Sequence, residues 1–176
     1  MILISNHLLS LPGFTVRIED AVVRINMAWV KDGDALHDAI AHCGAYDVFL
    51  DFPYGRTKPP VPEWQLDEAV AEAWKYMPRF FAVSNVEDPD VAADIDGNLP
   101  ETTMLVPKIE SLKGVLCLTD ILKRVDTSTI MLDTEDLFSG CNDQKTFLAA
   151  VDNVHKVCEQ FDVEVLRLYG VIFSEA

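Results

Sequence analysis

Residues 103–124 read TMLVPKIESLKGVLCLTDILKR, and this stretch contains both of the patterns that decide the fold. Its first eight residues form a short apolar run typical of a buried strand, and the run from Ser111 to Leu122 is helix-like. The strand ends in Lys108 and Glu110, two opposite charges, at the point where the helix begins. Because a buried charge is costly unless it is paired, this strand end is also the first candidate for a functional site.

The same alternation of strand-like and helix-like runs continues along the chain. We predict seven strands, within residues 1–5, 21–30, 46–52, 79–85, 103–110, 128–137 and 164–173. Helix-like runs cover residues 32–44, 65–77, 88–95, 111–124 and 143–161. Strands that alternate with helices in this way form β-α units and a parallel sheet. We therefore predict an α/β fold with parallel strands, in the form of a TIM-like (β/α) barrel.

The length of the chain limits this barrel. The chain has 176 residues, whereas a complete barrel usually needs ~250, so the predicted barrel is trimmed or incomplete. The same length predicts a single domain that spans residues 1–176. An open doubly wound sheet is the structural alternative. The motifs G-x-G-x-x-G and G-x-x-x-x-G-K-[ST] are absent from the sequence, so neither dinucleotide binding nor P-loop phosphate binding is indicated.

Composition excludes several classes of function. The formal net charge of −15 argues against nucleic-acid binding, because the phosphate backbone would be repelled. No run approaches the ~20 apolar residues of a membrane span, and the N-terminus lacks the basic region of a secretory signal. The four cysteines show no C-x-x-C spacing, which favours reduced structural cysteines in a cytoplasmic protein.

Polar side chains follow several of the predicted strands, at the edge where parallel α/β sheets bind their ligands. These residues are Arg24, Asn26, Asp51, Arg56, Lys58, Ser84, Asn85, Lys108, Glu110, Asp133, Glu135 and Asp136. Glu110, together with Asp136 or Glu135, could offer carboxylates to Mg²⁺, which prefers a few such ligands and fills its other positions with water and substrate oxygens. The basic members of the set are expected to meet a small anionic substrate, and Arg is best suited to carboxylate or phosphate.

Structural roles explain some of the same residues. Lys108 and Glu110 could be an ion pair without a functional role, and Arg24 could bridge strands. The acidic residues 133–136 could be a polar turn that caps the next element. The four histidines lie mostly on helix-like stretches, and the spacing of His37 and His42 is a poor zinc signal. A functional interpretation is favoured because so many charges fall at one edge.

Five segments resemble the barrel of the phosphoenolpyruvate/pyruvate superfamily, which includes pyruvate kinase and the citrate lyase β-subunit/hydroxy-acid aldolase family. In chain order they are VVRINMAW (22–29), LDFPYGRTK (50–58), FFAVSNVEDPDV (80–91), VPKIESLKGV (106–115) and IMLDTEDLFSG (130–140). The first resembles the V-x-R-x-N strand, the second L-D-x-x-G-P-x-I-R, the fourth K-I-E-N-x-x-G-V, and the last both R-G-D-L and x-E-D-L-A. Their order and spacing carry the likeness more than any single motif does.

This resemblance implies a set of site roles. Glu110 and Asp136 would be the ligands of Mg²⁺ or Mn²⁺, and Lys108 would lie beside the enolate oxygen as a catalytic residue. Arg24 would be catalytic and would also contact the substrate. The remaining substrate-binding residues would be Asn26, Asp51, Arg56 and Lys58. The metal would polarise a keto acid and stabilise its enolate, as a Lewis acid does.

Departures from pyruvate kinase favour one branch of the superfamily. The lid domain and the C-terminal domain of that kinase have no counterpart here, Ala28 stands where it has a serine, and Thr134-Glu135-Asp136 replaces its R-G-D turn. We therefore predict a Mg²⁺-dependent carbon–carbon lyase or aldolase that acts on a 2-keto acid or related carboxylate. The alternatives are a catalytically degenerate barrel that binds a keto acid or phosphorylated ligand as a regulatory or assembly subunit, and a phosphotransferase related to pyruvate kinase. A homo-oligomer is expected, because a trimmed barrel exposes apolar surface.

Overall fold

The computed structural model describes residues 1–9, 19–56, 59–60 and 62–167. Seven strands form one sheet: β1 (Ile2–Ser5), β2 (Ala21–Asn26), β3 (Asp47–Phe52), β4 (Phe80–Val83), β5 (Met104–Ile109), β6 (Thr129–Leu132) and β7 (Glu164–Arg167). The helices are α1 (Asn6–Leu9), the 3-10 helix η1 (Met27–Trp29), α2 (Gly33–Cys43), α3 (Leu66–Tyr76), α4 (Pro89–Asn98), α5 (Leu112–Leu122), α6 (Thr134–Ser139) and α7 (Gln144–Phe161). Within this part of the chain, no helix is long and apolar enough to cross a membrane.

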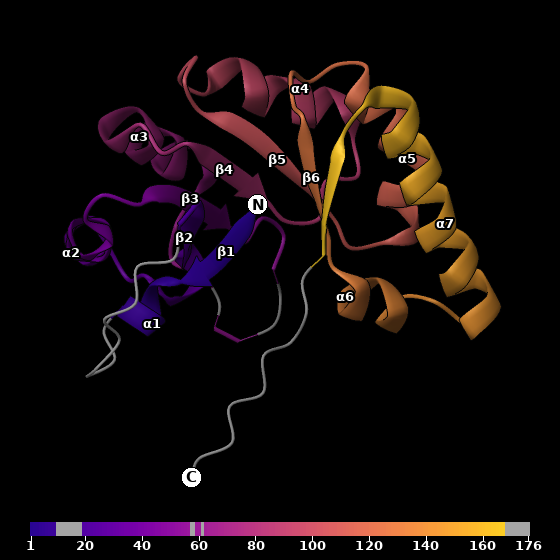
Figure 1. Ribbon diagram of the computed structural model, residues 1–176, viewed down its shortest axis with the longest axis horizontal. Helices are drawn as coiled ribbons and strands as arrows, with labels where there is room; N and C mark the ends of the chain where they lie inside the picture. Colours follow the sequence, from indigo (N-terminus) through magenta and orange to yellow (C-terminus); the bar gives the residue numbers. More distant parts are fainter. Residues whose placement is uncertain (10–18, 57–58, 61, 168–176) are drawn as a thin grey trace, which may run out of the picture.

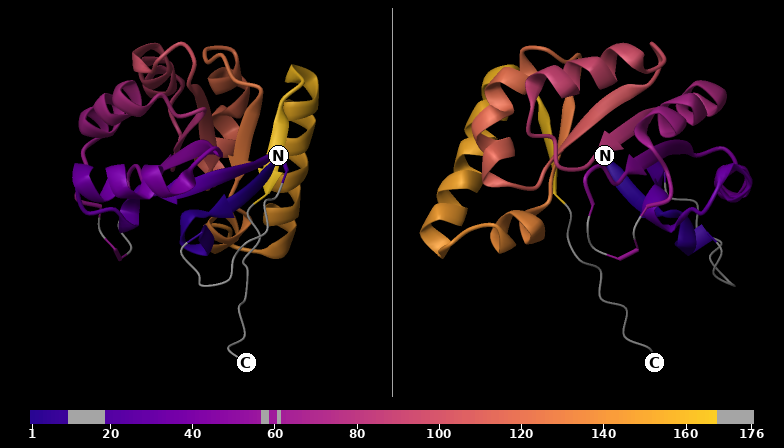
Figure 2. Two further views of the ribbon diagram at one scale, coloured as in Figure 1. Left: turned by 60° about the vertical axis from the view of Figure 1, so that its left-hand side comes forward. Right: turned by 180° about the vertical axis from the view of Figure 1, so that it is seen from behind.

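The sheet is a curled half-barrel, as predicted. Its strands follow one another in chain order from β1 to β7, and each neighbouring pair is parallel. A doubly wound sheet reverses its strand order at a switch point, so the constant order here excludes that alternative. The longer helices lie around the outer, convex side of the sheet (Figure 1; Figure 2). The N-terminal ammonium of Met1 lies 3.2 Å from a carboxylate oxygen of Glu164, so the edge strands β1 and β7 approach each other where they begin.

Two hydrophobic clusters stabilise the two faces of the sheet. The larger cluster joins the convex face to the helices and contains fully buried residues such as Leu36, Leu50 and Leu118. The smaller cluster consists of strand residues, with Val22, Phe49, Phe80, Ala82, Val106, Met131 and Leu166 at its centre. Burial on both faces explains why the strands are nearly continuous apolar runs in the sequence.

The concave face also positions the polar residues of the site. Side chains on a strand alternate between the two faces, so a residue two positions after an inward apolar residue also points inward. Two positions after members of the small apolar cluster stand Arg24, Asp51, Ser84, Lys108 and Asp133. These five form a polar layer on top of the apolar one, at the C-terminal ends of the strands.

Three short elements differ from the prediction. The predicted strand 21–30 ends at Asn26, because the side chain of Asn26 accepts a hydrogen bond from the Ala28 N–H and starts the turn η1. Residues 128–137 were predicted as a strand and its exit; the strand ends at Leu132, and the exit forms the helix α6, which Asp133 caps. The short helix α1 was not predicted, and the end of the predicted strand 164–173 lies outside the described residues.

Candidate active site

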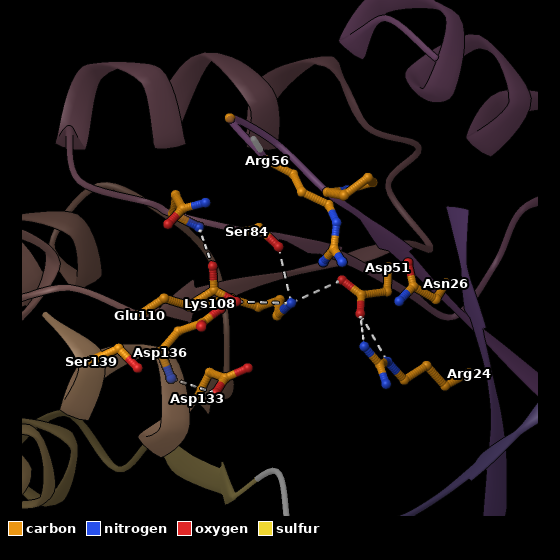
Figure 3. A pocket seen from close by; sticks show the side chains of 13 residues that line it. Arg24, Asn26, Asp51, Arg56, Ser84, Lys108, Glu110, Asp133, Asp136 and Ser139 are labelled. Carbon is orange, nitrogen blue, oxygen red and sulfur yellow. Dashed lines mark hydrogen bonds and ion pairs between the residues drawn. The ribbon is translucent and has the colours of Figure 1, made fainter. Parts of the chain in front are cut away.

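A pocket of about 360 Å³ opens at the C-terminal ends of strands β2 to β6 (Figure 3). Its lining residues are Arg24, Asn26, Asp51, Pro53, Gly55, Arg56, Ser84, Asn85, Lys108, Glu110, Asp133, Asp136 and Ser139. The pocket brings together the site residues predicted from the sequence, with two exceptions: Lys58 lies outside the described residues, and Glu135, the alternative metal ligand, does not line the pocket.

Lys108 is the central cation of the pocket. Its side chain is 6% exposed, and its Nζ lies 2.9 Å from Glu110 Oε1, 3.3 Å from Asp51 Oδ1 and 2.9 Å from Ser84 Oγ. Glu110 Oε1 and Ser84 Oγ lie at hydrogen-bond distance from this ammonium group, and Asp51 Oδ1 adds an ion-pair contact. Burial by itself lowers the pKa of Lys108, but the two carboxylates outweigh burial and raise the pKa above its usual value. Lys108 is therefore a fixed positive charge at neutral pH.

Asp51 joins Lys108 to Arg24. Nε of Arg24 donates to Asp51 Oδ2 over 2.8 Å, and a terminal nitrogen of the guanidinium contacts the same oxygen. The other oxygen, Oδ1, has no hydrogen-bond donor in the described part of the chain, and its contact with Lys108 is an ion pair. Burial by itself raises the pKa of Asp51, but Lys108 and Arg24 outweigh it and hold the pKa below its usual value. This buried carboxylate therefore orients both cations.

Glu110 is held through both of its oxygens. Oε1 pairs with Lys108, and Oε2 accepts a hydrogen bond of 3.0 Å from the backbone N–H of Asn85. Burial raises the pKa of Glu110 above its usual value, and the nearby negative charge of Asp133 acts in the same direction. Lys108 and the Asn85 N–H oppose this shift but do not cancel it. A further cation near Glu110 would therefore stabilise its ionised form.

Three carboxylates gather on one side of the pocket. Glu110, Asp133 and Asp136 each offer an oxygen atom, and these atoms lie within 4.8 Å of one another. Asp133 Oδ1 accepts hydrogen bonds from the N–H groups of Glu135 and Asp136, which fixes the start of α6 and places Asp136 at the pocket. Oxygen ligands of this kind suit a hard divalent cation such as Mg²⁺, so the residues present fit the metal that the sequence predicts. Glu135, the alternative ligand in the sequence, is exposed and does not line the pocket.

The remaining predicted substrate residues lie at the pocket but also have structural bonds. The guanidinium of Arg56 points into the pocket (Figure 3), while its Nε and one terminal nitrogen donate to the carbonyls of Pro60 and Pro59 over 3.2 and 3.0 Å. Asn26 lines the pocket while its Oδ1 caps η1, accepting from the Ala28 N–H over 3.0 Å. Both side chains are thus held at the pocket by the loops that carry them.

Several pocket residues received no role from the sequence. Ser84, Asn85 and Asp133 stand at strand ends in the sequence, but nothing there shows that they contact Lys108, Glu110 or the start of α6. Ser139 comes from the end of α6, which was not predicted as a helix. Strand alternation would have indicated that Ser84 and Asp133 point inward, whereas the backbone contact of Asn85 leaves no signal in the sequence.

Histidine and cysteine chemistry is not indicated at this site. Among the residues that the structure describes, no histidine lines the pocket. All four cysteines are free, and burial raises the pKa of Cys43 and Cys158 to about 11. A thiol with so high a pKa is a poor nucleophile at neutral pH, so the pocket relies on carboxylates, Lys108 and guanidinium groups.

Comparison with known proteins gives a fold but no sequence family. No family model and no curated protein sequence matches the chain. Among solved structures, the chain is similar to an HpcH/HpaI aldolase/citrate lyase family protein from Burkholderia cenocepacia. The two are 15% identical, the match covers 83% of this chain and 70% of that chain, and the TM-score is 0.65. A citrate lyase β subunit from M. tuberculosis, complexed with oxaloacetate and magnesium, has 13% identity over 94% of this chain and 76% of that one, with a TM-score of 0.60.

A pyruvate kinase from Cryptosporidium parvum represents the other branch of the superfamily. It has 14% identity over 83% of this chain and 52% of that one, with a TM-score of 0.62. At these identities the comparison establishes a shared fold. The resemblance stated from the five sequence segments is therefore confirmed at the level of the fold, which is similar to the barrels of both branches.

Proposed function

We propose that this protein is a Mg²⁺- or Mn²⁺-dependent carbon–carbon lyase or aldolase that acts on a 2-keto acid or related carboxylate through an enolate. One observation carries the proposal: the carboxylates of Glu110, Asp133 and Asp136 lie within 4.8 Å of one another and share a pocket with three basic side chains. The similar citrate lyase β subunit, complexed with oxaloacetate and magnesium, supports it.

The charges of the pocket suit a metal and an anion together. Its lining includes four acidic side chains and three basic ones, so it carries a formal charge of −1. A divalent ion would change this to +1, and the pocket would then attract a small carboxylate. The lining includes no aliphatic or aromatic side chain apart from Pro53, which favours a compact polar substrate.

Each group has a role that follows from its position. Glu110 and Asp136, with Asp133, would hold the ion, which supplies Lewis-acid polarisation of the keto group and stabilisation of the enolate. Lys108 would direct its fixed positive charge at the developing enolate oxygen. Asp51 would keep Arg24 oriented toward the substrate carboxylate, and Arg56 would add a second guanidinium from the β3 exit loop.

Metal binding tests the proposal directly. We expect Glu110→Gln and Asp136→Asn each to weaken Mn²⁺ or Mg²⁺ binding at least about tenfold in isothermal titration calorimetry. Glu135→Gln is the matched control, because Glu135 lies on the same turn but is exposed and outside the pocket. Its affinity should equal that of the wild type. Unchanged affinity in both site variants would eliminate the metal site.

Catalysis is tested by proton exchange. A protein that stabilises the enolate of pyruvate should exchange the methyl protons of pyruvate in D₂O when Mg²⁺ is present, which proton NMR follows. Wild-type protein should show exchange, and Glu110→Gln should show none above the rate with free metal. Exchange that persists in that variant would refute the proposed role of the metal.

A second candidate is a catalytically degenerate barrel that binds a small keto acid or phosphorylated ligand as a regulatory or assembly subunit. Two observations favour it: the described lining of the pocket contains no histidine that could act as a base, and the three oxygen atoms nearest to the Lys108 ammonium come from the protein itself. Measurable oxalate binding without proton exchange would support this candidate over the first. The likeness to a pyruvate kinase barrel is one of fold, and nucleotide binding in calorimetry would be required to support a phosphotransferase.

We further propose a cytoplasmic homo-oligomer built from a single domain of residues 1–176. The four free cysteines support a reducing compartment. Leu116, Phe138 and Leu148 are 81%, 53% and 55% exposed, respectively, and such apolar side chains are available for contact with another copy. Light scattering that finds a monomer at micromolar concentration would contradict the oligomer.

A further inference from the structure

Asn85 has an unusual backbone conformation at the edge of the pocket. It follows strand β4, and its φ of 51° places it in the left-handed region. Among residues other than glycine, Asn is one of the few that adopt this conformation readily. Asn85 lies between Glu110, one of the three clustered carboxylates, and the loop after β3 that carries Arg56.

The backbone at this turn faces strand β5. The N–H of Asn85 donates to Glu110 Oε2 over 3.0 Å, and the N–H of the next residue, Val86, donates to the carbonyl of Lys108 over 3.2 Å. The left-handed turn therefore fixes the carboxylate of Glu110 while leaving its other oxygen with Lys108.

The side chain of Asn85 makes a separate contact in the opposite direction. Its Nδ2 donates to the carbonyl of Tyr54 over 3.0 Å, in the loop that leaves β3 and carries Arg56. Gly55 in that loop has a φ of 67°, and a Cβ added there would lie 3.9 Å from Nδ2 of Asn85, so the two segments are close neighbours. The amide therefore holds the loop that presents Arg56 to the pocket.

We propose that Asn85 is a positioning residue with two separable functions. Its backbone conformation holds Glu110 for the cation, and its side-chain amide holds the β3 exit loop, with Arg56, for the anion. This inference rests on the proposed function, because it takes Mn²⁺ and a carboxylate as the ligands. Asparagine suits both functions, since glycine would supply the turn without the amide, and alanine would supply neither.

Two substitutions separate the functions. Asn85→Gly keeps the left-handed turn and the N–H but removes the amide. We expect its Mn²⁺ affinity to stay within about twofold of wild type, and its oxalate affinity in saturating Mn²⁺ to fall about fivefold, the effect of one hydrogen bond. Asn85→Ala also disfavours the turn, so its Mn²⁺ affinity should fall about tenfold as well, as is typical when the partner of a metal ligand is removed.

Both affinities can be measured by calorimetry, with thermal unfolding to show that each variant is folded. Equal Mn²⁺ affinities for folded Asn85→Gly and Asn85→Ala would overturn the backbone function. Unchanged oxalate affinity in Asn85→Gly would overturn the side-chain function.

A readout without metal distinguishes this inference from the proposed function. In ¹⁵N–¹H NMR spectra of the metal-free protein, Glu110→Gln should shift the Asn85 amide resonance, because it changes the charge of the acceptor. If the resonance shifts but the wild-type protein binds no Mn²⁺, the proposed function is rejected and the contact between Asn85 and Glu110 is kept. No shift would overturn the positioning role even if Mn²⁺ binds.

Discussion

Replacement of Lys108 by Met should strongly destabilise the folded protein at neutral pH. Methionine has a similar length and keeps the packing, but it removes the charge that Asp51 Oδ1 and Glu110 Oε1 face at 3.3 and 2.9 Å. Loss of one partner from a buried ion pair typically costs 3–5 kcal/mol. Because Asp51 retains Arg24 and Glu110 retains the Asn85 N–H, we expect the lower end, about 3 kcal/mol.

The loss in the free energy of unfolding caused by Lys108→Met should be smaller at lower pH. The pKa of Glu110 is already raised in the folded protein, so the native state binds its proton to higher pH than the unfolded chain does. By linkage, this group lowers stability as pH rises above 4.5, the usual pKa of a glutamate side chain. Loss of Lys108 should raise the pKa of Glu110 further. The loss of stability caused by Lys108→Met should therefore be smaller at pH 5 than at pH 7.

Asp51 acts with the opposite sign at lower pH. The pKa of Asp51 is lowered in the folded protein, so this group contributes stability that is present above 3.8, the usual pKa of an aspartate side chain, and is lost as pH falls below it. Between pH 5 and pH 7 Asp51 stays ionised in the wild type. Lys108 has the largest effect among the charges that hold this pKa down, so its loss should raise the pKa of Asp51 as well as that of Glu110. The pH dependence of the difference between wild type and Lys108→Met therefore reports on both carboxylates, which act with the same sign.

Urea unfolding at pH 7 and pH 5, followed by tryptophan fluorescence, measures both effects. Lys123→Met is the matched control, because Lys123 lies on the surface at the end of α5 and pairs only with the exposed Asp120 among the described residues. It should change the free energy of unfolding little at either pH. A penalty below about 1 kcal/mol for Lys108→Met at pH 7, the size expected of a surface pair, would refute the buried network. So would a penalty that does not decrease at pH 5.

Two further predictions concern the anion side of the pocket and the packing beneath it. Arg24→Met should weaken oxalate binding about tenfold in the presence of Mn²⁺, because a charge-assisted contact is lost. Arg79→Met is the control and should leave oxalate binding unchanged, since the Arg79 guanidinium pairs with Asp47 away from the pocket. Both affinities can be measured by calorimetry, and an equal loss in the two variants would show a general effect of charge rather than a contact with Arg24. Gly114→Ala should cost about 1–3 kcal/mol, because its Cβ would lie 2.9 Å from a backbone carbonyl oxygen. Gly97→Ala, with open space around the added Cβ, should be neutral or stabilise helix α4 by up to about 1 kcal/mol in urea unfolding; destabilisation of both variants alike would contradict the packing argument.

The strands could be predicted because the signal for them is local. Strand β5 (Met104–Ile109) and strand β3 (Asp47–Phe52) fall inside the apolar runs read from the sequence. Burial on both faces requires such continuous runs, and the alternation with helices requires parallel strands. The short elements were missed because side-chain caps such as Asn26 and Asp133 override the strand pattern within one or two residues.

The sequence by itself determined that charged residues would gather at the C-terminal ends of a parallel sheet, because chain order alone places those ends at one edge. It could not determine their partners. Lys108 pairs with Asp51 as well as Glu110, and Glu110 lies near Asp133, across strands that are far apart in the sequence. Those distances depend on the curl of the sheet and on the inward direction of each side chain. Only the tertiary structure therefore decided that the opposite charges of the PKIE segment belong to one buried network beside three clustered carboxylates.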